Sequence, residues 1–220
     1  MLTITCADLT TLVIKANFEP APIHIEFSFP QLQQLSIADN WSELGEGYHG
    51  QLLSGILVGA GPALTALTLS GTSLEERDFS EIDLVAHQLK TLIISTAEGS
   101  LLPPPEEFLQ HCDHIETLKL DLAGLSRLFD ILSFLPAPSL VNLQFYIYQN
   151  YEEEISPEDR QEIDSILSLP HLANLKSLRL VTLRDPNGPE FPDDPSEAED
   201  EVCEWALGWE EKGVMINVIW

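Results

Sequence analysis

Two histidines stand close enough in the sequence to hold a metal ion, in the stretch His111-Cys112-Asp113-His114. Residues three apart share one face of a helix, and the imidazole ring is a common zinc ligand. Structural zinc sites take four protein ligands, and no second pair with matching spacing occurs in this chain. We therefore interpret the stretch as the polar end of a helix, and we expect no metal and no cofactor.

The sequence patterns that mark catalytic sites are absent. The chain lacks the nucleophile motif G-x-S-x-G, the zinc-protease motif H-E-x-x-H and the phosphate loop G-x-x-x-x-G-K-[ST]. The stretch GAGPAL at 59–64 lacks the third glycine of a dinucleotide-binding loop. We expect a protein that is not an enzyme.

The charge balance restricts the classes of partner. The chain has 36 acidic and 10 basic residues, which gives a formal net charge of -26. Recognition of phosphate draws its affinity from Lys and Arg, so this balance argues against nucleic acid and against anionic membranes. Basic proteins remain possible partners.

The compartment is predicted from three negative features. No run of about 18 apolar residues could span a membrane. The first residues do not form a secretory signal, because they lack a basic start and a cleavage site. Cys6, Cys112 and Cys203 are odd in number and far apart, so we expect free thiols. Together these features favour the cytoplasm or the nucleus.

Acidic residues are concentrated near one end of the chain. Residues 152–201 hold 15 of them, and residues 185–195 form a Pro-rich loop within that region. Proline cannot continue a helix interior or a central strand. We expect the stretch 185–201 to be mobile, and dispensable for folding at least as far as Pro195. Such runs are more often solvated loops than docking sites.

One leucine spacing, L-x-x-L-x-L, recurs along the whole chain and predicts the elements that position its side chains. Counting Ile and Phe as equivalents, seven matches begin at Leu9, Leu32, Leu64, Leu89, Ile115, Leu140 and Leu175. The intervals are 23, 32, 25, 26, 25 and 35 residues. Four of these six fall within the 20 to 29 residues of a leucine-rich repeat, and inserted loops explain the two longer ones.

The middle of each motif is expected to be a short strand of one parallel sheet, with an apolar and a polar face. Helical patterns lie between the motifs. One places Phe79, Ile82, Val85 and Ala86 on one side, and another does so with Leu125, Leu128, Phe129 and Leu132. Capping signals support further helices after Ser156 and Ser196. Each repeat is thus predicted to be a strand, a turn and a helix.

On these motifs the chain resembles the leucine-rich repeat proteins over nearly its whole length. The resemblance implies an α/β solenoid (horseshoe) with a parallel sheet on the concave side and helices on the convex side. Residues 1–220 would then form a single domain of about seven to eight degenerate units. Family members carry Asn at the ninth motif position. Asn17 and Asn40 fit this rule, whereas the later repeats have Thr72, Ala97, Ala123, Tyr148 and Leu183.

Repeats of 25 or 26 residues are most similar to the ribonuclease-inhibitor-like class, and especially to the degenerate arrays of fungal F-box proteins. The final stretch EVCEWALGWEEKGVMINVIW, with a helix, a glycine and an apolar strand, is similar to the way those chains close. Trp205, Trp209 and Trp220 in it could form a docking patch. Their place in the last unit favours a role in sealing the end of the array.

The concave face is the candidate binding surface, because motif positions 3, 5 and 7 point away from the core. The amino-terminal repeats place small and hydroxyl side chains there. The last three repeats carry larger polar ones, namely Lys119, Asp121, Gln144, Tyr146 and Arg179. Arg and Tyr are residue types that anchor interfaces. The alternative is a solvated face whose cations offset the acidic loops.

Two functions remain open. The first is a protein interaction scaffold of the F-box type, which presents a target protein to a ubiquitin ligase as a monomer or within a larger complex. The F-box itself is missing before Leu9, so the chain would be a fragment or a relative without the adaptor. The second is an acidic leucine-rich repeat chaperone that holds basic proteins such as histones. Upstream coding sequence would discriminate between them.

Overall fold

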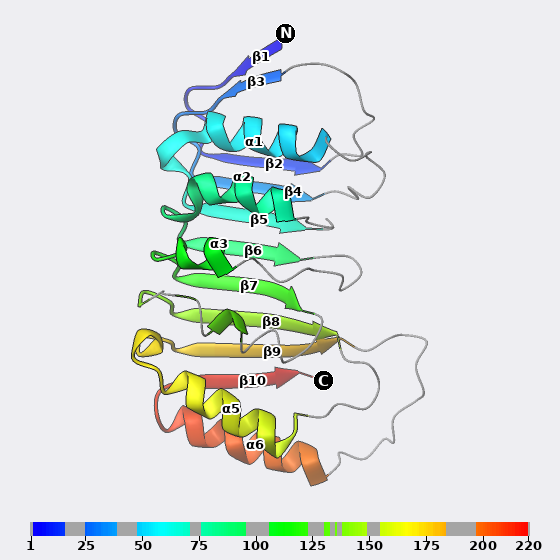
Figure 1. Ribbon diagram of the computed structural model, residues 1–220, viewed down its shortest axis with the longest axis vertical. Helices are drawn as coiled ribbons and strands as arrows, with labels where there is room; N and C mark the ends of the chain where they lie inside the picture. The colour runs from blue at the N-terminus through cyan, green and yellow to red at the C-terminus, as the bar shows by residue number, and fades with distance from the viewer. Residues whose placement is uncertain are drawn as a thin grey trace.

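The computed structural model describes ten parts of the chain, and the fold is built from them. They are residues 2–15, 25–38, 48–70, 76–95, 106–122, 130–132, 135, 138–148, 155–183 and 197–219. These parts form a large parallel sheet with helices in front of it, stacked along one long axis with the two ends of the chain far apart (Figure 1). The predicted α/β class is confirmed.

Eight parallel strands form the large sheet, and they neighbour one another in chain order. They are β2 (Thr11–Lys15), β4 (Gln34–Ala38), β5 (Ala66–Ser70), β6 (Thr91–Ser95), β7 (Thr117–Leu122), β8 (Asn142–Tyr148), β9 (Ser177–Leu183) and β10 (Met215–Ile219). Each of the seven leucine motifs overlaps one of the first seven strands, so the strand prediction is confirmed. The apolar strand expected at the end of the chain is β10.

The beginning of each strand from β4 to β10 is fixed by the same kind of hydrogen bond. The first residue of a strand donates its N–H to the carbonyl oxygen of the residue just before the neighbouring strand. Thr91 N donates to Thr65 O, for example, and Met215 N donates to Lys176 O. The seven bonds of this type measure 2.9 to 3.1 Å. The units therefore begin in step with one another along this edge, although the connections differ in length.

Helical segments precede the last six strands and cover one face of the sheet. They are α1 (Tyr48–Ala60), α2 (Glu76–Ala86), α3 (Glu106–Gln110), a turn at 130–132, α5 (Pro157–Leu167) and α6 (Glu197–Glu210). Short 3₁₀ turns, η2 (Gly61–Ala63) and η3 (Pro170–Leu172), follow α1 and α5. Gly213, with a φ of 88°, makes the left-handed turn from α6 into β10.

The sequence signals for these helices are met wherever the structure describes them. Phe79, Ile82, Val85 and Ala86 of α2 are all buried. Ser156 caps α5 by accepting a 3.1 Å bond from Asp159 N, while the Asp159 carboxylate accepts from Ser156 N at 2.9 Å. Leu132 is buried. Leu125, Leu128, Phe129 and Ser196 lie outside the described residues.

The start of the array differs from the predicted pattern, because the described residues before β4 form strands and no helix. β1 (Leu2–Thr5) and β3 (Ile25–Ser28) pair in parallel as a separate two-stranded sheet. They precede β2 and β4 as the helices precede later strands (Figure 1). The stretches LTIT and IEFS are rich in β-branched and aromatic residues and too short for a stable helix. In the first repeat, which begins at Leu9, the described residues after β2 thus form the strand β3 where a helix was predicted, whereas the second repeat has its predicted helix, α1.

A single hydrophobic core lies between the large sheet and the covering elements. One continuous cluster of buried residues runs from Phe29 to Ile216. Inward motif residues such as Leu67, Leu92 and Leu118 are at most 1% exposed. Each unit thus contributes its apolar strand face to a core that it shares with its neighbours.

Candidate interaction surface on the open face of the sheet

The face of the sheet away from the helices consists of alternate strand residues, and we call it the open face. On β5, Leu67 and Leu69 are buried under the helices, whereas Ala66, Thr68 and Ser70 are partly exposed. The same alternation occurs on β6. Motif positions 3, 5 and 7 thus lie on the open face, as the sequence predicted.

Parallel pairing in register aligns these residues into rows that run across the strands. The middle row passes through Val13, Ser36, Thr68, Ile93, Lys119, Gln144, Arg179 and Asn217. Adjacent strands lie about 4.8 Å apart, so the backbones of Lys119 and Arg179 are separated by about 10 Å. In the next row, Tyr146 pairs with Asp121 and with Val181.

The structure places all five predicted site residues on the three neighbouring strands β7, β8 and β9. Lys119, Gln144 and Arg179 share the middle row. Asn217 extends this row onto β10 and was not among the predicted site residues. No leucine motif marks β10, but the alternation of inward Ile216 and Val218 in VMINVI is the signal that could have found it.

Exposure varies among the predicted residues. Arg179 and Asn217 are exposed, and Lys119 and Gln144 are partly buried. Asp121 is only 3% exposed, so it is not the surface side chain that the sequence suggested. An outward strand position determines the face on which a side chain lies, but surrounding groups determine how much water reaches it. The structure describes the backbone of Tyr146 and not its side chain.

Two groups in the middle row have no partner within the described part of the chain. The Gln144 Nε2 atom is buried and has no hydrogen-bond partner there. A buried donor without a partner is uncommon in folded proteins and unfavourable. Arg179 likewise has no carboxylate partner among the described residues. The row therefore retains unused capacity to donate hydrogen bonds.

Three other cations of the described chain lie beside a carboxylate or an aromatic ring. Lys90 Nζ lies 2.9 Å from Glu116 Oε1 and Arg160 Nη2 lies 2.8 Å from Glu201 Oε2. Lys212 Nζ lies 4.1 Å from the ring centre of Trp209. Lys15 and Lys176, like Arg179, have no carboxylate partner among the described residues.

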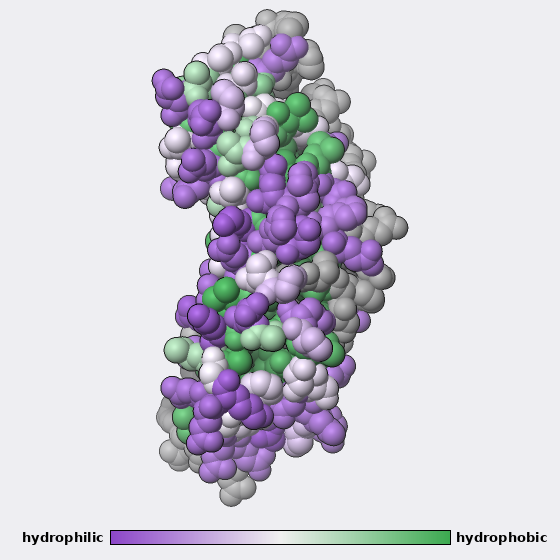
Figure 2. Space-filling model, turned by 90° about the vertical axis from the view of Figure 1, so that its left-hand side faces the viewer, coloured by the Kyte–Doolittle hydropathy of each residue, from purple (hydrophilic) through white to green (hydrophobic). Residues whose placement is uncertain are grey.

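Charge is distributed unequally between the two sides of the sheet. The eight strands contain three cations, Lys15, Lys119 and Arg179, and one carboxylate, Asp121. The helices are acidic: α2 and α5 each have four acidic residues and α6 has six. In Figure 2, which views the edge where the strands begin, the outline is hollowed on the side of the open face. The strands thus carry more cations than anions, whereas α2, α5 and α6, which cover them, are acidic.

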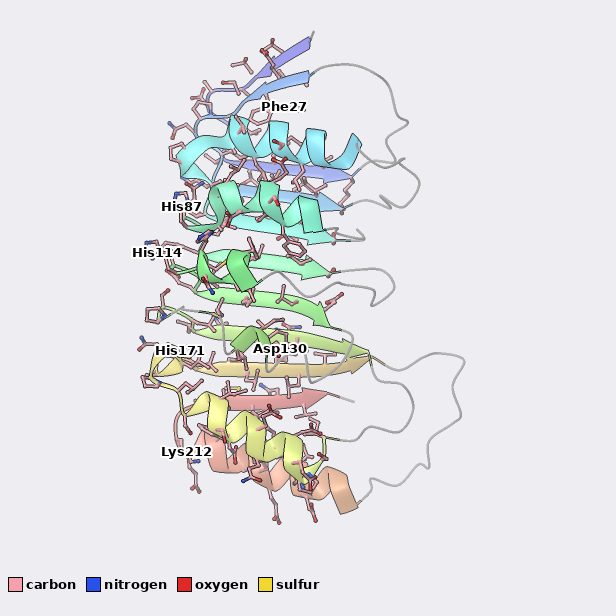
Figure 3. The ribbon with its side chains drawn as sticks, viewed as in Figure 1. Phe27, His87, His114, Asp130, His171 and Lys212 are labelled. Atoms are coloured by element: carbon pink, nitrogen blue, oxygen red, sulfur yellow. The ribbon has the colours of Figure 1, made fainter. Side chains whose placement is uncertain are left out.

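The histidine pair considered as a metal site does not have the expected structure. α3 ends at Gln110, so His111 and His114 lie in the following turn and not on a helix. His111 Nδ1 lies 2.7 Å from Asp83 Oδ1 of α2. His114 lies with His87 and His171 along the edge of turns that lead into the strands (Figure 3). Among the described residues no group of three potential ligands could hold a metal ion.

The cysteines form no disulfide, and two of the tryptophans bond one helix to another. All three cysteines are free, and burial raises the pKa of Cys112 to about 12, so its thiol stays protonated at neutral pH. The indole N–H groups of Trp205 and Trp209 both donate to Asp164 Oδ1, at 2.7 and 2.5 Å. These bonds join α6 to α5, which accords with a sealing role for this pair. Trp220 lies outside the described residues.

Comparisons with known proteins give no relative to which the chain can be assigned. No family model, no curated protein and no solved structure matches it. In the part of the chain that the structure describes, no helix has the length and apolar character needed to cross a membrane.

Proposed function

We propose that the chain is a leucine-rich repeat solenoid of the ribonuclease-inhibitor-like class, and that it acts as a protein-binding scaffold without enzymatic activity. The observation that carries this proposal is the change in side chains along the middle row of the open face. Val13, Ser36, Thr68 and Ile93 give way to Lys119, Gln144 and Arg179 on strands that share the same geometry. Packing of the core does not require that change.

Two features of the fold support the solenoid. Neighbouring strands follow chain order without exception in the eight-stranded sheet. The seven matching hydrogen bonds at the beginning of the strands repeat once per unit. Stacked repeats that contact only their neighbours produce both features. The hollowed outline beside the open face in Figure 2 accords with a concave binding side.

Within this class, the role that we propose is recognition of a target protein for an F-box-type ubiquitin ligase in the cytoplasm or nucleus. Support comes from the degenerate 25- and 26-residue repeats and from the closing helix, glycine and strand, α6, Gly213 and β10. An adaptor segment would have to come from outside the residues described.

The alternative is an acidic chaperone for basic proteins. One observation favours it: α2, α5 and α6 concentrate carboxylates on the side of the molecule opposite the open face. Binding through that side depends on charge more than on shape, so salt would weaken it steeply.

The two functions are tested by capturing proteins from a cell lysate on the immobilised chain, with quantitative mass spectrometry. The double variant Tyr146→Ala and Arg179→Ala removes the two largest side chains of the candidate site. Lys15→Ala with Thr68→Ala is the matched control, because it also removes one cation from the open face. We expect the first variant alone to lose the proteins that the unaltered chain retains.

The acidic function makes the opposite prediction. Capture would persist in the Tyr146→Ala and Arg179→Ala variant at low salt. It would disappear when Glu152 to Glu154 and the acidic residues from Asp193 to Glu201 are neutralised. That result would refute binding through the open face.

A further inference from the structure

We propose that the open face binds an acidic segment of its protein partner, and that the middle row on β7 to β10 receives the carboxylate or phosphate groups of that segment. The row consists of Lys119, Gln144, Arg179 and Asn217, and we call it the donor row. This inference rests on the proposed scaffold function and specifies the chemistry of the partner. It is the opposite of what the net charge of -26 suggests.

All four side chains of the donor row can donate N–H bonds. Lys and Arg have donors only, and the amides of Gln and Asn offer two donors each. Oxygen anions accept several such bonds, and the planar guanidinium matches carboxylate and phosphate groups with two parallel bonds. The same row on β2, β4, β5 and β6 has no cation and no amide. The chemistry of the row therefore changes at Lys119.

Two members of the row have donors that the described chain does not satisfy. Gln144 Nε2 is buried without a partner, and Arg179 is exposed without a carboxylate. Asp121, the single acidic residue of the eight strands, lies in the next row, where it is opposite Tyr146 in the register of β7 and β8. Rotation of the Gln144 amide about its last bond exchanges its oxygen and nitrogen, so the NH₂ group can turn toward a ligand.

The acidic helices do not prevent an anion from binding on the opposite face. Exposed charges interact little beyond about 8 Å at physiological ionic strength. The helices are separated from the donor row by the sheet itself and by the core. The local charges on the strands, which are mostly basic, therefore dominate at short range.

The length of the row sets the size of the ligand. Four strands at about 4.8 Å spacing place Lys119 and Asn217 about 14 Å apart. An extended peptide rises about 3.3 Å per residue, so roughly four residues would cover the row. A segment with more than one carboxylate, or with one phosphorylated residue, fits this length.

The test uses short fluorescein-labelled peptides and fluorescence anisotropy on the full chain. One peptide alternates Glu with Gly, one has a single phosphoserine among Gly and Ser, and two controls replace Glu by Gln or by Lys. We expect saturable binding of the Glu peptide, the phosphoserine peptide or both, and none of the Gln and Lys peptides. The first two probes distinguish carboxylate from phosphate as the source of the anion.

Two charge reversals separate the donor row from general electrostatics. Arg179→Glu should weaken the acidic probe about tenfold or more, since it removes a charge-assisted contact. Lys15→Glu changes the net charge equally on the same face, and should weaken binding less than about twofold because Lys15 lies on β2. Gln144→Leu removes the amide without altering charge and should weaken binding by about three- to tenfold.

Three outcomes would overturn the inference. They are binding of the Lys peptide alone, equal weakening by the two charge reversals, and no saturable binding of either anionic probe. If protein capture still depends on Tyr146 and Arg179 in the third case, the scaffold function stands and only the acidic partner is wrong. Circular dichroism verifies that each variant folds, and Arg179→Gln replaces Arg179→Glu if the reversal does not fold.

Discussion

The two faces of the large sheet are built from alternate residues of the same strands, yet they differ in solvent exposure and in side-chain chemistry. On β7, Leu118 and Leu120 are at most 1% exposed under the helical layer, while Thr117 and Lys119 are partly exposed on the open face. The covered face has buried apolar residues on every strand from β4 to β10. The middle row of the open face changes along the array from Val13, Ser36, Thr68 and Ile93 to Lys119, Gln144 and Arg179. We therefore expect stability and recognition to depend on opposite sides of one backbone.

This difference allows the open face to vary without loss of the fold. Burial of apolar area supplies most of the free energy of folding, and it is located between the sheet and its covering layer. Substitutions on the open face change little buried area. The predictions below test this division, from the largest expected effect to the smallest.

Truncation of a covered residue should have the largest effect. Leu118→Ala should lower the free energy of unfolding by about 2 to 5 kcal/mol, through lost burial and a cavity. Its neighbour Thr117 accepts only an exposed 3.3 Å bond from Asn142 Nδ2, so Thr117→Ala should cost little. Urea unfolding of both variants checks this. Equal losses would mean that the two faces are assigned in reverse.

A methyl group added to the covering layer should have the next largest effect. A Cβ atom at Gly59 of α1 would overlap the carbonyl oxygen of Phe27, and Phe29 N donates to Gly59 O at 2.7 Å. Gly59→Ala should therefore destabilise the protein by about 1 to 3 kcal/mol. Thermal unfolding gives the shift.

The matched control is Gly208→Ala in α6, where nothing lies within 4 Å of an added Cβ. Alanine favours a helix over glycine by about 1 kcal/mol, so this variant should be as stable as the unaltered chain or more so. Destabilisation of similar size at both glycines would show that α1 does not pack closely on β3.

Substitution on the open face should change stability by less than about 0.5 kcal/mol. Arg179→Ala is the sharpest case, because the side chain is exposed and has no carboxylate partner among the described residues. We expect its melting temperature to equal that of the unaltered chain while binding is lost. A drop comparable to that of Leu118→Ala would show that Arg179 supports the fold.

Removal of part of the Pro-rich loop should have the smallest effect. Residues 187–194 lie outside the described residues, between β9 and α6, and their sequence cannot sustain a helix interior or a strand ladder. Deleting them should leave the melting temperature nearly unchanged in differential scanning calorimetry. A large loss would indicate that this segment packs against the rest of the chain.

Much of this division could be predicted from the sequence, because it follows from local geometry. The two-residue period of a strand assigned Leu118 inward and Lys119 outward without reference to any other segment. The recurrence of the motif then placed seven strands side by side, and the shared fifth motif position brought Lys119, Gln144 and Arg179 into one row. The Ser156 capping box was equally local, since its partner is three residues away.

Interactions between distant residues were decided only by the tertiary structure. β1 pairs with β3, and β3 contacts α1 where Phe27 meets Gly59, but no period in the first residues predicts either contact. The burial of Asp121 and the shared acceptor of Trp205 and Trp209 also come from separate segments. A periodic pattern predicts on which face of the sheet a side chain lies, from the sequence of its own strand alone. Its solvent exposure and its partners depend on neighbours brought close by folding, and these determine which outward residues remain available to bind.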